Sequence, residues 1–323
     1  MTQMMAPLLS IIIPTYNRPV LLQRAVRSAL AQTLEGALEG ALEGAPEGES
    51  EAAIEVLVVD DCSPLPVTVV EHPRLSLVRL PVNSGGAAAR NEGARLARGK
   101  YISYLDDDDQ LLPGMAQRAI AALKQATLPQ PVAVLGGIEV INSDGRVEST
   151  RLPPTLPKGA HFALEEAQPG KSFLCKQTMV VERSVLLGMG GFDESFQSRV
   201  HTELFFRLNQ VCSIVGLPAV TYQLTAHEGP RVSRSPALRQ LSFEQLVAKH
   251  RALFEAHPPQ FALFVYRHAQ ILLNMGQRRA ALSALLWALK IHPPRSLSLL
   301  AYELKERFLS FPIAAYKAVQ SAF

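Results

Sequence analysis

Short apolar runs alternate with amphipathic stretches along the first third of the chain. The β-branched run at 8–13 predicts a buried strand that stops at Pro14, since proline cannot donate to a sheet ladder. The helical spacing of apolar positions over 18–32 predicts a helix that begins behind Pro19. The same patterns predict further strands at 55–59, 75–80 and 101–105, and a helix of small residues at 87–97.

This alternation of strands and helices predicts an α/β fold, in which a mostly parallel sheet is flanked by helices. Polar clusters at 14–18, 60–63 and 106–109 each follow a predicted strand directly. The carboxyl ends of parallel strands lie at one edge of a sheet, and ligands of such folds bind there. We therefore expect the three clusters to form one binding site.

The end of the chain, from Pro236 onward, has helical periodicity throughout. Residues 266–293 contain an apolar helix, a glycine turn, an alanine-rich helix and a stop at Pro293, which resembles one tetratricopeptide-like helix pair. We predict two domains, 1–230 and 231–323. One such pair cannot bury its own apolar face, so it should pack on the first domain, on another subunit or on a membrane surface.

A low-complexity insertion interrupts the first domain at 34–53. It repeats Leu-Glu-Gly-Ala three times and then decays into Pro-Glu-Gly-Glu. A glycine at every fourth position weakens a helix by ~1 kcal/mol each relative to alanine. We therefore expect an acidic surface loop with no part in the chemistry.

The composition, 48% hydrophobic and 19% charged residues over 323 positions, is that of a soluble globular protein rather than a disordered chain or a coiled coil. No 18 uncharged apolar residues run together, and the start lacks the basic region and cleavage site of a signal peptide. We expect a cytoplasmic protein. Its three cysteines, widely spaced, indicate reduced thiols rather than disulfides or a zinc site: Cys62, Cys175 and Cys212.

Charge is unevenly distributed, although the net charge of +3 is too small to indicate nucleic-acid binding. Residues 231–323 contain 13 Lys and Arg against 4 Asp and Glu, a net charge of +9, while the remainder carries −6. Such a basic segment suits phosphates or the inner face of an anionic membrane. A solvated face of a helical domain is the alternative.

Four consecutive aspartates, Asp106 to Asp109, follow the predicted strand at 101–105. This concentration of negative charge is unfavourable unless water or a cation meets it, and carboxylate oxygens suit Mg²⁺ or Mn²⁺. On extended backbone, Asp106 and Asp108 would point the same way and leave the intervening carboxylate for another partner. A solvated turn or a helix N-cap would explain the run equally well without a metal.

Asp61 also lies at a strand end, where a carboxylate can accept hydrogen bonds from a ribose hydroxyl or a base N–H, or serve as an ordinary turn residue. Gly85-Gly86 opens the next helix, but the spacing of a dinucleotide fingerprint and of a P-loop is absent. That argues against a dinucleotide oxidoreductase and a P-loop NTPase. Arg90, one turn into this helix, could face a phosphate.

Together these segments resemble a known family. Leu-Ser-Ile-Ile-Ile-Pro-Thr-Tyr-Asn-Arg-Pro, Glu-Val-Leu-Val-Val-Asp-Asp-Cys-Ser-Pro, the stretch from Asn83 to Pro113 and Gly-Gly-Phe-Asp-Glu occur in the order found in family 2 glycosyltransferases. The resemblance covers residues 8 to about 230. It implies the GT-A nucleotide-binding fold with a C-terminal helical extension.

The resemblance also implies roles for individual residues. Asp61 would recognise the donor base, Arg90 would help to hold the donor, and Asp106 with Asp108 would form the Asp-x-Asp pair. Asp108 would contact Mn²⁺ or Mg²⁺ directly, and the ion would neutralise the departing diphosphate. Three residues would line the nucleotide pocket: Pro14, Tyr16 and Asn17.

Relatives of this kind invert the anomeric centre and need a general base beside the acceptor hydroxyl. The usual base aspartate aligns here with His201, whose unperturbed pKa of ~6.5 suits the role. We prefer His201, with Glu203 as the competing base. The remaining alternative is that both only support the local helix.

Residues 222–233 resemble a late family segment in which a histidine and a basic loop close over the diphosphate. By that resemblance His227 would be a third metal ligand and Arg231 would hold phosphate oxygens. A solvent-exposed loop explains both residues as well.

The resemblance implies a hexosyltransferase-type enzyme that moves a sugar from a nucleoside-diphosphate sugar, by default a UDP-sugar, to a saccharide or lipid-linked hydroxyl acceptor. Glycan, polysaccharide or glycolipid synthesis would be the process. One alternative is a nucleotidyltransferase, which also holds Mg²⁺ with strand-end carboxylates. Another is a catalytically impaired glycosyltransferase-like protein that acts through its basic helices, by membrane binding or self-association.

Overall fold

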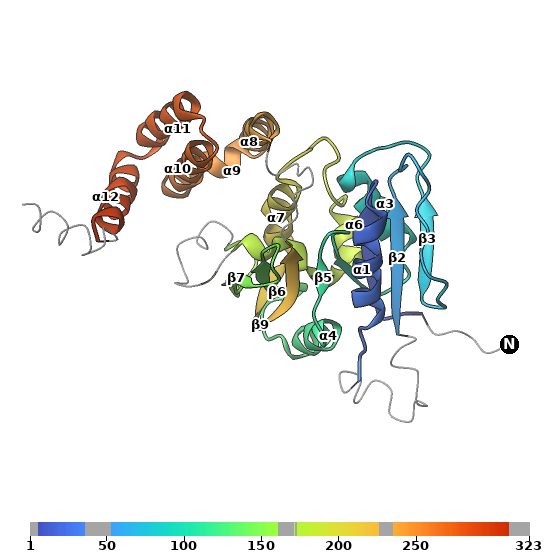
Figure 1. Ribbon diagram of the computed structural model, residues 1–323. Helices are drawn as coiled ribbons and strands as arrows, with labels where there is room; N and C mark the ends of the chain where they lie inside the picture. Colours follow the sequence, from blue (N-terminus) through green and yellow to red (C-terminus); the bar gives the residue numbers. More distant parts are fainter. Residues whose placement is uncertain (1–5, 36–52, 161–170, 172, 226–234, 310–323) are drawn as a thin grey trace, which may run out of the picture. The chain divides into compact units, whose positions relative to one another are not determined.

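The computed structural model describes residues 6–35, 53–160, 171, 173–225 and 235–309. The chain forms two compact units, Met1–Val232 and Ser233–Phe323. Figure 1 labels the elements of both units. The predicted insertion at 34–53 lies almost entirely outside the described residues.

The first unit alternates strands with helices along its first half. Its helices are α1 (Pro19–Leu30), α3 (Gly86–Leu96), α4 (Met115–Gln125), the 3₁₀ helix η2 (Phe173–Thr178), α6 (Arg183–Gly188) and α7 (Val200–Val211). Its strands are β1 (Leu9–Thr15), β2 (Ile54–Asp60), β3 (Leu75–Arg79), β4 (Tyr101–Tyr104), β5 (Gln110–Leu111), β6 (Val132–Ile141), β7 (Val147–Arg151), β8 (Val180–Glu182) and β9 (Ser213–Thr225).

The described strands make one nine-stranded sheet in the order β3-β2-β1-β4-β8-β6-β9-β5, with β7 paired to β6. The first four strands are mutually parallel, as the βα alternation predicts. Beyond β4 the sheet is mixed, because β8 runs antiparallel to both β4 and β6, whereas β6 and β9 are parallel. The parallel part brings the ends of β1, β2 and β4 to one edge.

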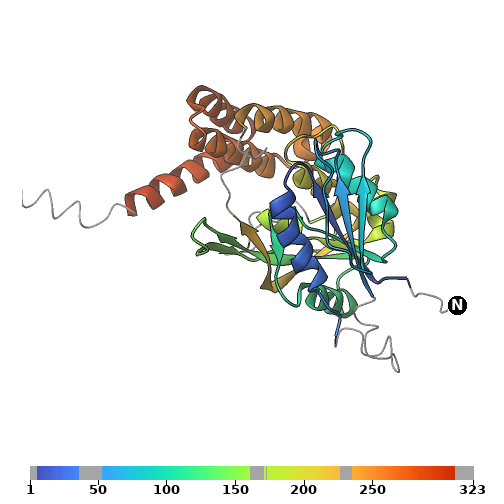
Figure 2. The ribbon, with the colours of Figure 1, turned by 45° about the vertical axis from the view of Figure 1, so that its right-hand side comes forward.

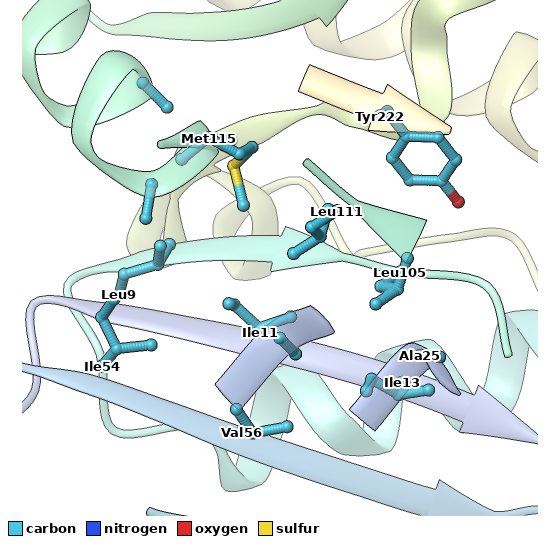
Figure 3. Close-up of a cluster of buried hydrophobic side chains, with 14 of the residues drawn as sticks. Leu9, Ile11, Ile13, Ala25, Ile54, Val56, Leu105, Leu111, Met115 and Tyr222 are labelled. Atoms are coloured by element: carbon cyan, nitrogen blue, oxygen red, sulfur yellow. The ribbon is translucent and has the colours of Figure 1, made fainter. Parts of the chain in front are cut away.

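Both faces of the sheet are buried at β1, which explains why this strand is apolar on consecutive positions. Ile11 and Ile13 face one side and pack under α1 and α4, whereas Ile12 faces α3, α6 and α7. Figure 3 shows the first of these clusters, in which the ring of Tyr222 lies among the aliphatic side chains. Figures 1 and 2 show α1 and α3 on opposite faces of the sheet.

Strand β1 continues through Pro14 to Thr15, so the prediction that Pro14 ends it was wrong. The backbone groups of Ile12 point to β4, where its carbonyl accepts from the N–H of Leu105. Pro14 has the same orientation by strand alternation, but β4 pairing ends at Ile12 with Tyr104. Its missing N–H therefore removes no ladder hydrogen bond.

Helix α3 lies unusually close to the sheet because residue 93 is glycine. A Cβ at Gly93 would come within 2.4 Å of Ile12 Cγ2 and 3.3 Å of Val59 Cγ2. Buried alanines continue this contact face on either side of it. The small residues thus bring the start of α3, including Arg90, close to the edge of the sheet where β1, β2 and β4 end.

The second unit is helical, with five described helices: α8 (Pro236–Lys249), α9 (Arg251–Glu255), α10 (Pro258–Asn274), α11 (Arg278–Ile291) and α12 (Pro293–Leu309). The predicted glycine turn is Gly276, whose φ of 76° favours glycine. Pro293 ends α11 as expected but also begins α12, since proline is well tolerated at a helix start. Among the described residues, no helix combines the length and apolarity that a bilayer crossing requires.

Candidate active site

The three polar clusters converge at the carboxyl edge of the parallel strands, as their positions predicted. Thr15 lies beside Asp60 in the β1–β2 register. Its hydroxyl donates to Asp107 Oδ2 over 2.7 Å, which joins the first cluster to the aspartate run. The N–H of Asn17 donates to Ser63 Oγ over 2.9 Å, which joins the first cluster to the second.

The four aspartates form a turn rather than extended backbone, closed by a 3.1 Å hydrogen bond from the N–H of Asp109 to the carbonyl of Asp106. Asp107 turns aside to Thr15 and Arg18. One carboxylate oxygen from each of Asp106, Asp108 and Asp109 lies within 4.8 Å of the others. The expected pairing of Asp106 with Asp108 is present, with Asp109 as a third member that the sequence analysis missed.

Asp109 is fixed by a strand distant in sequence. Tyr222 Oη donates to Asp109 Oδ2 over 2.9 Å, and the N–H of Thr225 donates to Oδ1 over 3.0 Å. Tyr222 Oη also accepts from the N–H of Asp106 at 3.3 Å. Local sequence patterns do not predict a hydrogen bond between residues more than a hundred positions apart, so the sequence analysis assigned Tyr222 no role in the site.

Two guanidinium groups offset part of the negative charge. Arg18 Nη1 lies 2.9 Å from Asp107 Oδ1 and 3.1 Å from Asp108 Oδ2, and Arg90 Nη2 lies 2.5 Å from Asp106 Oδ1. Burial opposes ionisation of Asp106, but the charge and hydrogen bond of Arg90, with smaller contributions from His201 and Arg18, outweigh it, so the pKa of Asp106 is lowered.

Among the described residues, no Lys or Arg forms an ion pair with Asp109. Burial, followed by the charges of Asp106 and Asp108, raises the pKa of Asp109 well above its usual value. The negative charge of the cluster is therefore only partly offset by Arg18 and Arg90. Three convergent carboxylates with this unfavourable charge fit a hard divalent cation such as Mg²⁺ or Mn²⁺, which prefers oxygen ligands.

Helix α3 organises the loop that follows α6. Arg90 lies over the ring of Phe192, 5.7 Å from its centroid. Asn91 holds the backbone of the same residue from both sides, accepting from its N–H at 2.8 Å and donating to its carbonyl at 2.9 Å. Neighbouring side chains of α3 thus fix Phe192 beside the Arg90–Asp106 pair.

His201, the second residue of α7, meets the ring of Phe192 edge-on, with centroids 5.3 Å apart. Its Nδ1 is buried and has no hydrogen-bond partner among the described residues. Burial, and then the nearby charge of Arg90, lowers the pKa of His201 to about 3. The imidazole is therefore neutral at physiological pH.

Glu203 has a different environment, because its side chain is 0% exposed. Both carboxylate oxygens accept from Arg207, at 2.8 and 2.6 Å. Arg207 in turn donates to the carbonyls of Met189 and Gly191. This buried ion pair ties α7 to the loop before Phe192, which is a structural role that leaves Glu203 poorly placed to meet an acceptor.

The residues expected on the donor side differ in exposure. Pro14 is buried within β1, whereas Tyr16 and Asn17 are exposed beyond its end. Asp61 is buried and accepts from the N–H groups of Ser84 at 2.7 Å and Gly85 at 2.8 Å. It therefore shapes the glycine turn that precedes α3.

His227 and Arg231 lie outside the described residues. The roles expected for them, a third metal ligand for His227 and a phosphate contact for Arg231, therefore stay predictions.

Comparison with known proteins agrees with this geometry. A family model described as glycosyl transferase family 2 matches residues 10–187. Over 163 residues the chain is 34% identical to the succinoglycan biosynthesis protein ExoO of Rhizobium meliloti (strain 1021), covering 47% of this chain and 41% of that protein. Over 228 residues it is 29% identical to the hyaluronan synthase of Pasteurella multocida, covering 68% of this chain and 21% of that protein. The chain thus spans less than half the length of these relatives.

Among solved structures, S. aureus TarS 1-349 in complex with UDP-GlcNAc resembles the chain with a TM-score of 0.50 and 19% identity. The likeness covers 82% of this chain and 81% of that one. At this identity it shows the fold. The predicted GT-A architecture with C-terminal helices is confirmed, and so is the family resemblance on which it was based.

The partly buried, neutral His201 predicts a specific acid sensitivity. Below pH ~6.5 the unfolded chain protonates this histidine, whereas the folded chain does so only near pH 3. Between these values the unfolded state binds more protons, so His201 removes up to about 1.4 kcal/mol of stability per pH unit as the pH falls.

Urea unfolding of the wild type and of His201→Gln between pH 7 and pH 4.5 measures this contribution. The wild type should lose more unfolding free energy than the variant as the pH falls. Parallel loss in the two proteins would show that the histidine is not held in its neutral form.

Proposed function

The chain belongs to glycosyl transferase family 2, and from that premise we propose an inverting, metal-dependent glycosyl transfer. The donor is a nucleoside-diphosphate sugar, and the acceptor is a hydroxyl group of a saccharide or a lipid-linked glycan. The observation that carries the proposal is the convergence of Asp106, Asp108 and Asp109 at the carboxyl edge of the parallel strands. Ligands of open α/β sheets bind at this edge.

A divalent ion bound by Asp108 and its neighbours would neutralise the diphosphate and make it a better leaving group. Asp108 is the proposed direct ligand, and His227 would complete the set from beyond the described residues. Arg18 contacts both Asp107 and Asp108 and therefore holds the ligand carboxylate in place. Arg90 holds Asp106 in the same way.

The nucleotide would lie over the ends of β1 and β2, against Pro14, Tyr16 and Asn17. Asp61 already accepts two backbone N–H groups, but each carboxylate oxygen retains a lone pair for another donor. We propose that one of these accepts from the base. Arg231 would contact phosphate oxygens. UDP-GlcNAc, the ligand of the S. aureus TarS complex, makes UDP-sugars the first donors to test.

His201 is the proposed general base, since Glu203 is committed to Arg207. The base takes the acceptor proton while the hydroxyl oxygen attacks the anomeric carbon from the side opposite the diphosphate, which inverts that centre. A pKa of about 3 makes free His201 a weak base. Burial depresses this pKa most, and the charge of Arg90 adds to the effect. An anionic donor beside Arg90 would offset that charge, so we expect the pKa of His201 to rise on binding.

The weak basicity of free His201 also favours a second candidate, a glycosyltransferase-like protein that binds the donor without efficient transfer. The two candidates share the donor site and differ in turnover. Donor binding without measurable transfer to any saccharide acceptor would favour the second. A nucleotidyltransferase is disfavoured by the family membership.

The names of two relatives, a succinoglycan biosynthesis protein and a hyaluronan synthase, support a polysaccharide as the product. Nucleotide sugars are strongly charged and do not cross bilayers unaided. We therefore place the reaction in the cytoplasm, where the acceptor can be a growing polysaccharide or a lipid-linked oligosaccharide at the inner membrane face.

Replacing Asp108 with Asn tests the metal assignment. We expect Asp108→Asn to lower Mn²⁺-dependent release of UDP from a UDP-sugar on the order of 100-fold, since it removes a charged ligand. UDP with Mn²⁺ at 100 times Kd should stabilise the wild type by about 2.7 kcal/mol in a thermal-shift assay, and the variant much less.

Asp144→Asn is the matched control, because Asp144 is exposed in the turn between β6 and β7. It should retain both turnover and the Mn²⁺-dependent shift. Turnover by Asp108→Asn equal to that of the control would contradict the metal assignment.

Two variants of α7 separate the candidate bases. His201→Ala should lower kcat by roughly 100-fold or more while leaving UDP binding intact. Glu203→Gln should act through stability, because it removes the buried charge that pairs with Arg207. Steady-state kinetics and thermal melts of both variants measure these effects. Loss of turnover in a folded Glu203→Gln, with His201→Ala active, would reverse the assignment.

A further inference from the structure

Helix α11 presents two different faces. Its buried side consists of Ala281, Ala284 and Ala288, small residues that allow close packing within the helical unit. Leu282 and Leu286 lie on another side and are 58% and 52% exposed. At 100° per residue, these leucines project well away from the buried alanines. Two exposed leucines one turn apart are not needed for the packing of this unit.

Basic residues accompany these leucines. Arg278 and Lys290 lie four residues before Leu282 and four after Leu286, so all four side chains share a sector of about 120°. Arg279 lies within the same sector. All three basic residues are exposed. We call the five residues the α11 face: Arg278, Arg279, Leu282, Leu286 and Lys290.

Acidic residues are absent from a long stretch around this face. From Ala256 to Tyr302 the sequence contains five Lys and Arg and no Asp or Glu. The next acid, Glu303, is half-buried and accepts a hydrogen bond from Tyr266 Oη. Ordinary solvated helix faces mix both signs of charge, so this pattern is unusual for a surface that meets only water.

Helix α12, which contacts α11, adds further exposed apolar side chains, namely Leu297, Tyr302 and Leu304. Trp287 is also 37% exposed, but its ring meets Phe243 and Phe261 edge-on. Trp287 thus belongs to the packing of the helical unit itself.

We propose that the α11 face binds an anionic lipid surface, with Leu282 and Leu286 in the headgroup region and the basic side chains at lipid phosphates. Charge complementarity selects this partner, because apolar residues flanked only by Lys and Arg match an anionic bilayer. Two copies of the face would repel one another, which disfavours self-association. The inference rests on the helical unit and is independent of the proposed function.

Sedimentation of the full chain with large unilamellar vesicles tests the proposal. The chain should bind vesicles of phosphatidylcholine and phosphatidylglycerol at 3:1 in 0.15 M NaCl. Its binding should be at least tenfold weaker to vesicles of phosphatidylcholine alone, and at least tenfold weaker to the mixed vesicles in 0.5 M NaCl. Leu282→Ser with Leu286→Ser should weaken binding about tenfold or more. Arg278→Gln, Arg279→Gln and Lys290→Gln should each weaken it about fivefold.

Leu65→Ser is the matched control, since Leu65 is 81% exposed in the first unit. It should bind as the wild type does, and thermal melts should show that every variant folds. Equal binding by the double leucine variant and the control would overturn the proposal, as would no binding to anionic vesicles. A concentration-dependent dimer in light scattering, lost in the leucine variant, would assign the face to self-association instead.

Discussion

The concentration of carboxylates in the turn after β4 is the constraint on which the candidate site depends. Four aspartates at one sheet edge repel one another, and the chain offsets this repulsion in distinct ways. Arg18 bridges Asp107 and Asp108, and Arg90 pairs with Asp106. Within the described part of the chain, Asp109 accepts hydrogen bonds but pairs with no Lys or Arg, and burial together with the charges of Asp106 and Asp108 raises its pKa. A divalent ion and an anionic donor are the partners that this imbalance suits.

The same residues extend from the charged turn to the other side of the site. Arg90 joins Asp106 to the ring of Phe192, and Phe192 meets His201 edge-on. Asn91 clamps the backbone of Phe192, while the Glu203–Arg207 pair anchors the loop before it. Helix α3 can hold this arrangement because Gly93 lets it lie directly on β1 and β2. The small residues of α3 are therefore part of how the site is built.

Much of this could be read from local pattern. The strands at 8–13, 55–59 and 101–105 and the meeting of three polar clusters follow from periodicity and from the geometry of parallel strands. The end of β1 was predicted wrongly because proline breaks a strand only where its nitrogen would face a hydrogen-bonded neighbour strand. Whether it does so depends on the tertiary pairing of β1 with β4, which ends before Pro14. The pairing of Asp109 with Tyr222 was missed because it links segments that are distant in sequence. Glu203 was considered as a base, although Arg207 one helical turn later already indicates an ion pair.

Anomalous diffraction from crystals of the full chain grown with Mn²⁺ and UDP tests the central claim most directly, because it locates the ion without reference to turnover. The account predicts one strong manganese peak within coordinating distance, about 2.2 Å, of an Asp108 oxygen, with the diphosphate on its other side. Bound UDP with no manganese peak, or a peak away from Asp106, Asp108 and Asp109, would contradict it.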